Sequence, residues 1–318
     1  MHLILGIIMR LLSAIGSMTA IFCVSLMAVA ANPPAQKLAE IVAPASEWQV
    51  VAKGLSFADA PSLDADGNFY FSDLRATPPG IFRVAPGESD KPAEPQKIIE
   101  DGRSGTKLGP DGRLYGCGNE KIVAYELPGG KMTVLAEGVK PNDLAVSHRG
   151  HIYFTETAKN QISFIDGKGG AVVAADVGTA KRPNGITLSA DQSRLMVSEA
   201  GGDKIWSFAI QPDGSLADKK VFATMQAPPA KPGVAGGDGM TVDTTGRVYV
   251  TSALGVQIFA PAGELLGILP KPKEGPMTSC GFGGKDLAYL HITCGDTIFR
   301  RKTQATGVVF YKAPALAK

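Results

Sequence analysis

Residues 66–72 read DGNFYFS, a tight turn followed by a strand that ends in a small hydroxyl residue. The pattern returns as DGRLYGC at 111–117, RGHIYFT at 149–155, QSRLMVS at 192–198, TGRVYVT at 245–251 and AYLHIT at 288–293. The final residues, Ser72, Cys117, Thr155, Ser198, Thr251 and Thr293, are spaced by 45, 38, 43, 53 and 42 residues. A strand-and-turn unit repeating every 40–50 residues, roughly, is typical of propeller blades, so six copies predict six blades.

The residues around each copy complete an antiparallel sheet. A second strand such as Ile81–Val84 follows by a short turn, and a glycine turn with an edge strand, clearest at 129–135, comes next. With the strand before each copy, every blade has four strands. Two terminal segments, 48–52 and 306–310, also alternate like strands, and we expect them to close the last blade. The sequence therefore predicts an all-β, six-bladed β-propeller whose ring is closed by N- and C-terminal strands.

The N-terminus differs in kind from the rest of the chain. Residues 1–30 contain no acid, one base (Arg10), a long apolar run and the small-x-small sequence Ala28-Val29-Ala30, which is the form of a signal peptide. An uncleaved membrane anchor is the alternative, since the run approaches a bilayer span. Residues 31–47 are read as a loose leader and 48–318 as one propeller domain. Cleavage predicts a periplasmic or secreted protein with no stable membrane association.

Net charge and cysteine content bear on two further points, nucleic-acid binding and the state of the thiols. The formal net charge is +2 and no basic run is interleaved with aromatic residues, so the sequence gives no indication of nucleic-acid binding. The sequence does not indicate an oligomeric state. Removing the signal peptide leaves Cys117, Cys280 and Cys294, an odd number that means at least one free thiol or an intermolecular bridge. We expect three buried thiols.

Four blades carry an Asp or Asn at a matching position in the strand before the repeated pattern. Asp59, Asn142 and Asp238 stand 13 residues before the hydroxyl position, and Asn184 stands 14 before it. In a propeller these strands line the central channel, so the four oxygens are expected at one depth. An isolated Asn-Gly or Asp-Gly is usually a turn, but four in phase are harder to explain as turns. Two carboxylates and two amides suit a hard divalent cation, with Ca²⁺ favoured over Mg²⁺ or Zn²⁺.

The histidines and the insertion at 225–237 are weaker candidates for functional residues. His148 and His151 have a suggestive spacing but stand in a turn, and neither they nor His291 lie in the channel segments, so zinc fits poorly. The insertion at 225–237 either covers the site or is a floppy surface excursion. No nucleophile elbow or Cys/His pair is evident, which disfavours covalent catalysis.

These motifs carry a family resemblance from about Gly54 to Arg301. The stretch 140–144 (KPNDL) followed by 152–155 (IYFT), together with 183–185 (PNG), 238–243 (DGMTVD) and 281–284 (GFGG), resembles the SMP-30/gluconolactonase/luciferin-regenerating-enzyme family. The resemblance implies a six-bladed propeller, a channel metal that is usually Ca²⁺, hydrolysis of lactone or ester-like bonds, and metal ligation by Asn142, Asn184 and Asp238. Asp59-Ala60-Pro61 stands where the family has Glu-x-Pro, Glu156 where Asp is usual, and Ser104-Gly105 where it has Asn-Gly.

The sequence reading of function is an exported, metal-dependent lactonase acting on a small-molecule lactone. Asp238 is the candidate base and a metal ligand with Asp59, Asn142 and Asn184. Lys140, Asp143 and Arg182 are candidate substrate-binding residues, and Asp143 is also expected to orient Asn142. Blades two and six are expected to offer no oxygen at the depth of the ligands. A phosphotriesterase- or fluorophosphatase-like hydrolase and a non-catalytic ligand-binding propeller are the alternatives.

Overall fold

The computed structural model describes residues 34–86, 94–166, 173–175 and 180–314. The predicted signal peptide lies outside this part of the chain. Apart from one short helix, α1 (Pro34–Ala39), and two 3₁₀ turns, η1 (Thr157–Lys159) and η2 (Lys285–Leu287), the regular elements are strands. No helix of the described residues is long and apolar enough to cross a membrane.

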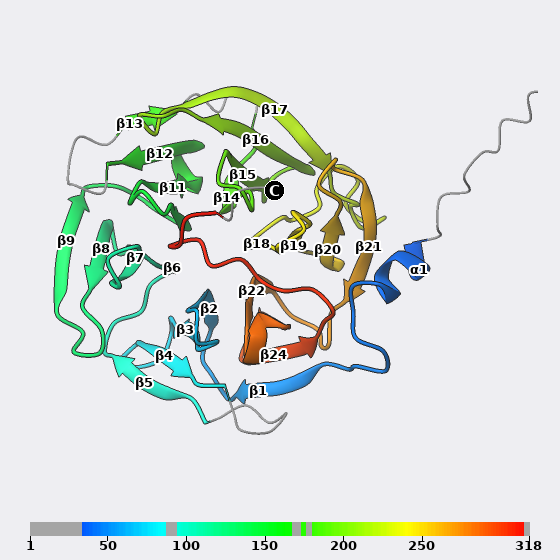
Figure 1. Cartoon of the computed structure of the whole chain (residues 1–318), viewed down its shortest axis with the longest axis horizontal. Helices are drawn as coiled ribbons and strands as arrows, with labels where there is room; N and C mark the ends of the chain where they lie inside the picture. The colour runs from blue at the N-terminus through cyan, green and yellow to red at the C-terminus, as the bar shows by residue number, and fades with distance from the viewer. Residues whose placement is uncertain (1–33, 87–93, 167–172, 176–179, 315–318) are drawn as a thin grey trace, which may run out of the picture. The chain divides into compact units, whose positions relative to one another are not determined.

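Six four-stranded antiparallel sheets lie around a centre, as blades of a propeller (Figure 1). Blade 1 contains β2 (Ala58–Leu63), β3 (Phe69–Asp73), β4 (Gly80–Val84) and β5 (Gln96–Ile99). Blade 2 contains β6 (Gly105–Leu108), β7 (Leu114–Gly118), β8 (Lys121–Tyr125) and β9 (Met132–Glu137). Blade 3 contains β10 (Leu144–Val146), β11 (Ile152–Glu156), β12 (Gln161–Ile165) and β13 (Val173–Ala175).

The second half of the chain repeats this arrangement. Blade 4 contains β14 (Pro183–Leu188), β15 (Arg194–Glu199), β16 (Lys204–Ile210) and β17 (Leu216–Thr224). Blade 5 contains β18 (Met240–Val242), β19 (Val248–Ser252), β20 (Gly255–Phe259) and β21 (Leu265–Pro270). Blade 6 contains β22 (Met277–Gly283), β23 (Tyr289–Cys294), β24 (Thr297–Lys302) and β1 (Gln49–Lys53). The prediction of six four-stranded blades is confirmed.

The ring closes through the N-terminal strand, as expected, but its partner is not the predicted one. β1 pairs with β24, so the segment 49–53 completes the last blade. The segment 306–310 was expected to do this and does not, because β24, the last strand of the chain, already pairs with β1. Instead the C-terminal segment runs across the centre of the ring (Figure 1). Gly307 bridges Asp243, and the amide of Ala65 and the side chain of Gln192 bind the segment further along.

Each pair of neighbouring blades encloses its own apolar cluster, because alternate strand residues face the next sheet. One such cluster joins Tyr70 and Ile81 of blade 1 to Leu114 and Tyr125 of blade 2, and five others repeat it around the ring. The hydrophobic stabilisation is therefore distributed over six interfaces rather than one core.

The leader at 31–47 is not loose where the structure describes it. Helix α1 contacts β21, Lys37 pairs with Glu264, and Ile41 is 1% exposed within the cluster between blades 5 and 6. The three predicted thiols are confirmed, since Cys117, Cys280 and Cys294 are free and buried.

Candidate active site

In blades 2 to 5 the residue at the repeated hydroxyl position bonds a carbonyl oxygen at the start of the next blade's inner strand. Thr155 Oγ1 donates to the carbonyl oxygen of Asn184 at 2.6 Å, and Ser198 Oγ donates to that of Asp238 at 2.8 Å. Cys117 Sγ lies 3.3 Å from the carbonyl oxygen of Asn142, where the thiol replaces the hydroxyl as a weaker donor. The backbone of three predicted ligands is thus held by the pattern that revealed the blades.

An acidic residue directly after the hydroxyl position fixes the loop that leads to the inner strand. The carboxylate of Asp73 accepts hydrogen bonds from the amides of Ser56 and Phe57, and that of Glu156 accepts one from Lys140. Glu199 does the same for the amide of Lys181. Glu156 is 1% exposed, and although burial opposes it, hydrogen bonds from Lys159, Lys140 and Ser163 lower its pKa. It therefore holds a loop and does not offer a free carboxylate to the centre.

Three carboxylates at the start of the inner strands act on one another electrostatically, and we call Asp59, Asp143 and Asp238 the carboxylate cluster. Burial raises the pKa of Asp59 to about 7, and the charge of Asp143 adds to the rise, whereas bonds from Ala60 and Thr278 and the charge of Lys107 lower it. Burial, followed by the charges of Asp59 and Asp143, raises the pKa of Asp238 well above its ordinary value. Like charges gathered in a desolvated place resist ionisation together, unless a cation joins them.

The two predicted amide ligands stand at the same end of the inner strands. Asn142, Asn184, Asp59 and Asp238 are each half-buried. The oxygen Oδ1 of Asn184 is shielded and has no hydrogen-bond partner among the described residues. An unpaired amide oxygen costs about 1–3 kcal/mol when it is desolvated. Within the described residues, however, no group of three or more His, Cys, Asp or Glu side chains is arranged to hold a metal ion.

Asp143 occupies a different position from the one expected for it. Its Oδ1 accepts the amide of Leu144 at 2.8 Å and its Oδ2 accepts that of Ile186 at 3.3 Å, so both oxygens face backbone. The structure gives no hydrogen bond from Asp143 to Asn142. At 8% exposure, its carboxylate lies deeper than its neighbours, where burial raises its pKa and the charge of Lys107 opposes the rise.

The candidate substrate-binding cations lie outside the cluster. Lys140 and Arg182 are exposed, two residues before Asn142 and Asn184, in the loops that lead to the inner strands. The amide of Arg182 donates to Asn160 Oδ1 at 2.7 Å, which fixes its backbone while the guanidinium stays in solvent. The insertion 225–237 lies at this end too, with its base held by bonds from Met225 to Asp203 and from Ala235 to Gly202. These hydrogen bonds fix the two ends of the insertion, so it is not a loose surface excursion at those ends.

Two features of the site were missed. Blade 6 was expected to contribute no oxygen at the depth of the ligands, but the hydroxyl of Thr278 donates to the carbonyl oxygen of Ala58 at 3.0 Å, next to Asp59, and lies 2.7 Å from Thr293 Oγ1. Blade 2 contributes Lys107, whose charge acts on Asp59 and Asp143. Lys107 could have been found from the sequence, because a lysine in the innermost strand of a blade is unusual. Ser104, the blade 2 counterpart of the ligands, binds back to the carbonyl of Cys117.

The histidines take no part in the cluster. His148 Nδ1 lies 2.9 Å from Gln192 Oε1 in the turns at the opposite end of the strands, in agreement with the turn interpretation. His291 is 2% exposed and stacks on Phe69 with ring centroids 4.2 Å apart. Burial and the charge of Arg300 lower its pKa to about 3, so it is neutral at physiological pH.

We expect Asp59→Asn to stabilise the protein against heat in EDTA, most at pH 8, less at pH 5 and least near pH 4. Because the pKa of Asp59 is raised from 3.8 to about 7 in the folded state, its contribution to the unfolding free energy falls as pH rises from about 4 to about 7. Asparagine resembles the protonated acid and escapes that loss. Thermal midpoints of both proteins across this range check the result.

Comparing the two proteins at each pH cancels the opposite contribution of His291, which is lost as pH falls below 6.5. If the wild type and Asp59→Asn had equal thermal midpoints at pH 8, the raised pKa of Asp59 in the folded protein would be contradicted.

The fold is a six-bladed propeller with Asp59, Asn142, Asn184 and Asp238 at the start of its inner strands. Residues 57–296 match the family model described as an SMP-30/gluconolactonase/LRE-like region, and the chain belongs to this family. It is 28% identical over 294 residues to a gluconolactonase of Zymomonas mobilis, covering 81% of this chain and 82% of that protein.

Solved structures agree on the fold. A gluconolactonase from Xanthomonas campestris has a TM-score of 0.68 at 23% identity, covering 84% of this chain and 92% of that one. A calcium-binding regucalcin from Agrobacterium tumefaciens has a TM-score of 0.64 at 14% identity, covering 83% and 97%. At these identities the likeness concerns the fold alone.

Proposed function

We propose that this protein is a metal-dependent hydrolase that opens the lactone of a sugar acid, with Ca²⁺ as the cation. The observation that carries the proposal is the carboxylate cluster beside the unpaired oxygen of Asn184. The gluconolactonase relative supports the substrate class, and the calcium-binding neighbour supports the cation.

The residues present fit a hard cation. Asp59, Asn142, Asn184 and Asp238 would hold it, because Ca²⁺ takes carboxylate and amide oxygens. An amide oxygen without a partner and carboxylates with raised pKa values are what such a ligand set shows in the protein alone. When bound, the cation would polarise the lactone carbonyl and stabilise the negative charge that develops on its oxygen.

Asp238 is the proposed general base. The attacking water forms a bond to the carbonyl carbon while Asp238 takes its proton. The ring C–O bond then breaks, and the proton passes to the departing alkoxide oxygen. A carboxylate with a raised pKa accepts a proton more readily than one in solvent, which suits Asp238 for this step.

Lys140 and Arg182 are proposed to hold hydroxyl or carboxylate groups of the substrate, because both are exposed beside the predicted ligands. Asp143 has no such role in this proposal, since its oxygens already accept two backbone amides. We also propose export to the periplasm or medium, on the signal-peptide form of residues 1–30. N-terminal sequencing of the protein from fractionated cells tests that point.

The test is hydrolysis of an aldonolactone panel with Ca²⁺ and with EDTA. We expect turnover that EDTA abolishes and that added Ca²⁺ restores. A matched assay with phosphotriesters distinguishes the lactonase from the alternative, a phosphotriesterase-like hydrolase. Turnover that EDTA leaves unchanged would contradict the metal mechanism, and cation binding without turnover on any substrate would favour a binding protein.

A further inference from the structure

The C-terminal segment lies across the ring at the end opposite the candidate site. The amide of Thr244 in blade 5 donates to the carbonyl oxygen of Thr306 at 2.9 Å. The amide of Gly307 donates to the carbonyl oxygen of Leu287 in blade 6 at 3.0 Å. Thr244 and Leu287 stand in the connections that follow the inner strands, whereas the candidate ligands stand at the starts of those strands. The segment therefore crosses the far mouth of the channel (Figure 1).

The other half of the segment is fastened to two further blades. The side chain of Gln192 in blade 4 donates to the carbonyl oxygens of Phe310 at 2.7 Å and Lys312 at 3.1 Å. The amide of Ala65 in blade 1 donates to the hydroxyl oxygen of Tyr311 at 2.7 Å. Hydrogen bonds to blades 1, 4, 5 and 6 thus hold the segment on opposite sides of the mouth, as a strap rather than a free terminus.

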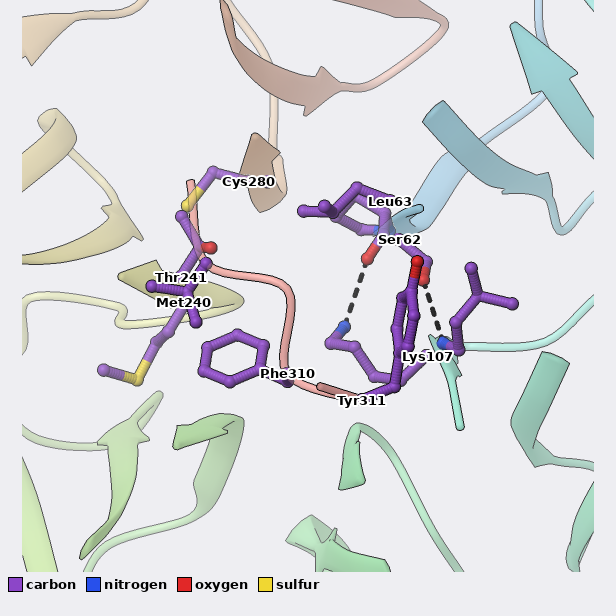
Figure 2. Close-up of a pocket in the computed structure, with 12 residues that line it drawn as sticks. Ser62, Leu63, Lys107, Met240, Thr241, Cys280, Phe310 and Tyr311 are labelled. Atoms are coloured by element: carbon purple, nitrogen blue, oxygen red, sulfur yellow. Dashed lines mark hydrogen bonds between the residues drawn. The ribbon is translucent and has the colours of Figure 1, made fainter. Parts of the chain in front are cut away.

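Three side chains of the segment close the space beneath it. Val308, Phe310 and Tyr311 line a cavity of about 30 Å³ whose other walls come from the inner strands β2, β6, β18 and β22. The rings of Phe310 and Tyr311 lie between Met240 on one side and Lys107 on the other (Figure 2). A cavity of this size has room for about one water molecule, so the side chains nearly fill the mouth that the segment crosses.

The cavity lies deeper in the channel than the candidate ligands. Pro61 and Met240 line it, and each stands two residues along the chain from a candidate ligand, Asp59 or Asp238. Two residues of extended chain cover about 7 Å. The segment therefore stands between the level of the ligands and the solvent at the far end.

We propose that residues 306–312, which we call the C-terminal plug, seal the channel at this end, so that water and small molecules pass through the site end alone. A propeller whose channel is open at both ends would admit water to the inner strands from both sides. The plug leaves one way in and out, so a small molecule that enters at the site end has to leave by the same end. The inference does not rest on the chemistry proposed above.

Cys280 can report on the seal. Its thiol is free, it lines the cavity under the plug, and the residue is 2% exposed. Cys117 and Cys294 are also free and buried, but they do not line this cavity. The Sγ of Cys117 lies 3.3 Å from the carbonyl oxygen of Asn142, at the site end. Opening of the plug should therefore expose Cys280 selectively, whereas unfolding exposes all three thiols.

The experiment measures how fast each thiol reacts with N-ethylmaleimide at pH 7.5, resolved by peptide mass spectrometry, in the wild type and in Phe310→Ala/Tyr311→Ala. We expect the Cys280 rate to rise about tenfold or more in this variant, because packing that must break before the cavity opens is gone. The rates of Cys117 and Cys294 should stay within about twofold of the wild type. Phe310→Leu/Tyr311→Phe is the matched control, since it keeps the mouth filled, and its Cys280 should react nearly as slowly as in the wild type.

The labelling pattern also gives the results that would overturn the inference. Rapid labelling of Cys280 in the folded wild type would do so, as would an unchanged Cys280 rate in the folded double alanine variant. A rise shared by all three thiols would mean that the double variant unfolds, and Phe310→Ala and Tyr311→Ala, each made alone, then decide. A selective rise at Cys280 in either single variant supports the plug. The absence of a selective rise in both would leave the segment a role in stability and none in sealing the channel.

Discussion

Asp238→Asn is expected to lower kcat/KM on an aldonolactone by about 10³-fold, the range a positioned general base contributes. The same substitution should raise the thermal midpoint in EDTA. Burial and the charges of Asp59 and Asp143 raise the pKa of Asp238, so its ionised form is destabilising in the protein alone. An amide of the same shape removes that charge. Activity and stability should therefore move in opposite directions, as is common where a site stores unfavourable charge.

The measurement needs steady-state kinetics at saturating Ca²⁺, a Ca²⁺ titration and a melting curve in EDTA. Asp66→Asn is the matched control, because Asp66 is an exposed aspartate in the turn at the opposite end of blade 1. It should leave both quantities unchanged. If Asp238→Asn lowered the thermal midpoint in EDTA and kept full activity, Asp238 would not be the general base and would have a structural role.

The blades were predictable because the repeated pattern is local. Alternation in segments such as 68–72 is set by the pleat of one strand, and the turn before it by Asp-Gly chemistry. The same pattern predicted the depth of Asp59, Asn142, Asn184 and Asp238 because the hydroxyl position hydrogen-bonds the next inner strand. That bond recurs from blade 2 to blade 5, as at Thr155 and Ser198, whereas Thr293 of blade 6 bonds Ser279 of its own blade.

In blade 6 the 13-residue spacing from the hydroxyl position does not identify the residue that points toward the site. Counting 13 residues back from Thr293 reaches Cys280, which carries no ligand oxygen. The register of β22 on β23 shifts between Met277 and Ser279, so Ser279 lies opposite Thr293, and the hydroxyl of Thr278 donates to the carbonyl oxygen of Ala58, next to Asp59. A bulge inserts a residue that no count from the sequence reveals.

The C-terminal segment and Lys107 were missed for a related reason. Residues 306–310 alternate like a strand, but their partners are turns of four blades, which are distant in sequence. The charge of Lys107 matters only because β6 lies beside β2 and β10, which brings its side chain near Asp59 and Asp143. Both depend on tertiary contacts rather than on local pattern.

Gly185→Ala is expected to destabilise the protein by about 3 kcal/mol, at the upper end for overpacking. A Cβ atom on Gly185 would lie 2.0 Å from the carbonyl oxygen of Asp238 and 2.7 Å from the Cα of Gly239. These are backbone atoms, which cannot rotate away as a flexible side chain does. Blades 4 and 5 must then separate at the level of the predicted ligands, so Ca²⁺ affinity should fall together with stability.

The control is Gly129→Ala in the turn between β8 and β9. A Cβ atom there meets nothing within 4 Å, so we expect a change of no more than about 0.5 kcal/mol. Urea denaturation with and without Ca²⁺ measures both variants. If Gly185→Ala unfolded like the wild type and bound Ca²⁺ equally well, the two inner strands could not be as close as the structure places them. Gly185 would then be a turn residue only. A selective loss at Gly185 would instead show that it permits the contact between blades on which the ligand geometry depends.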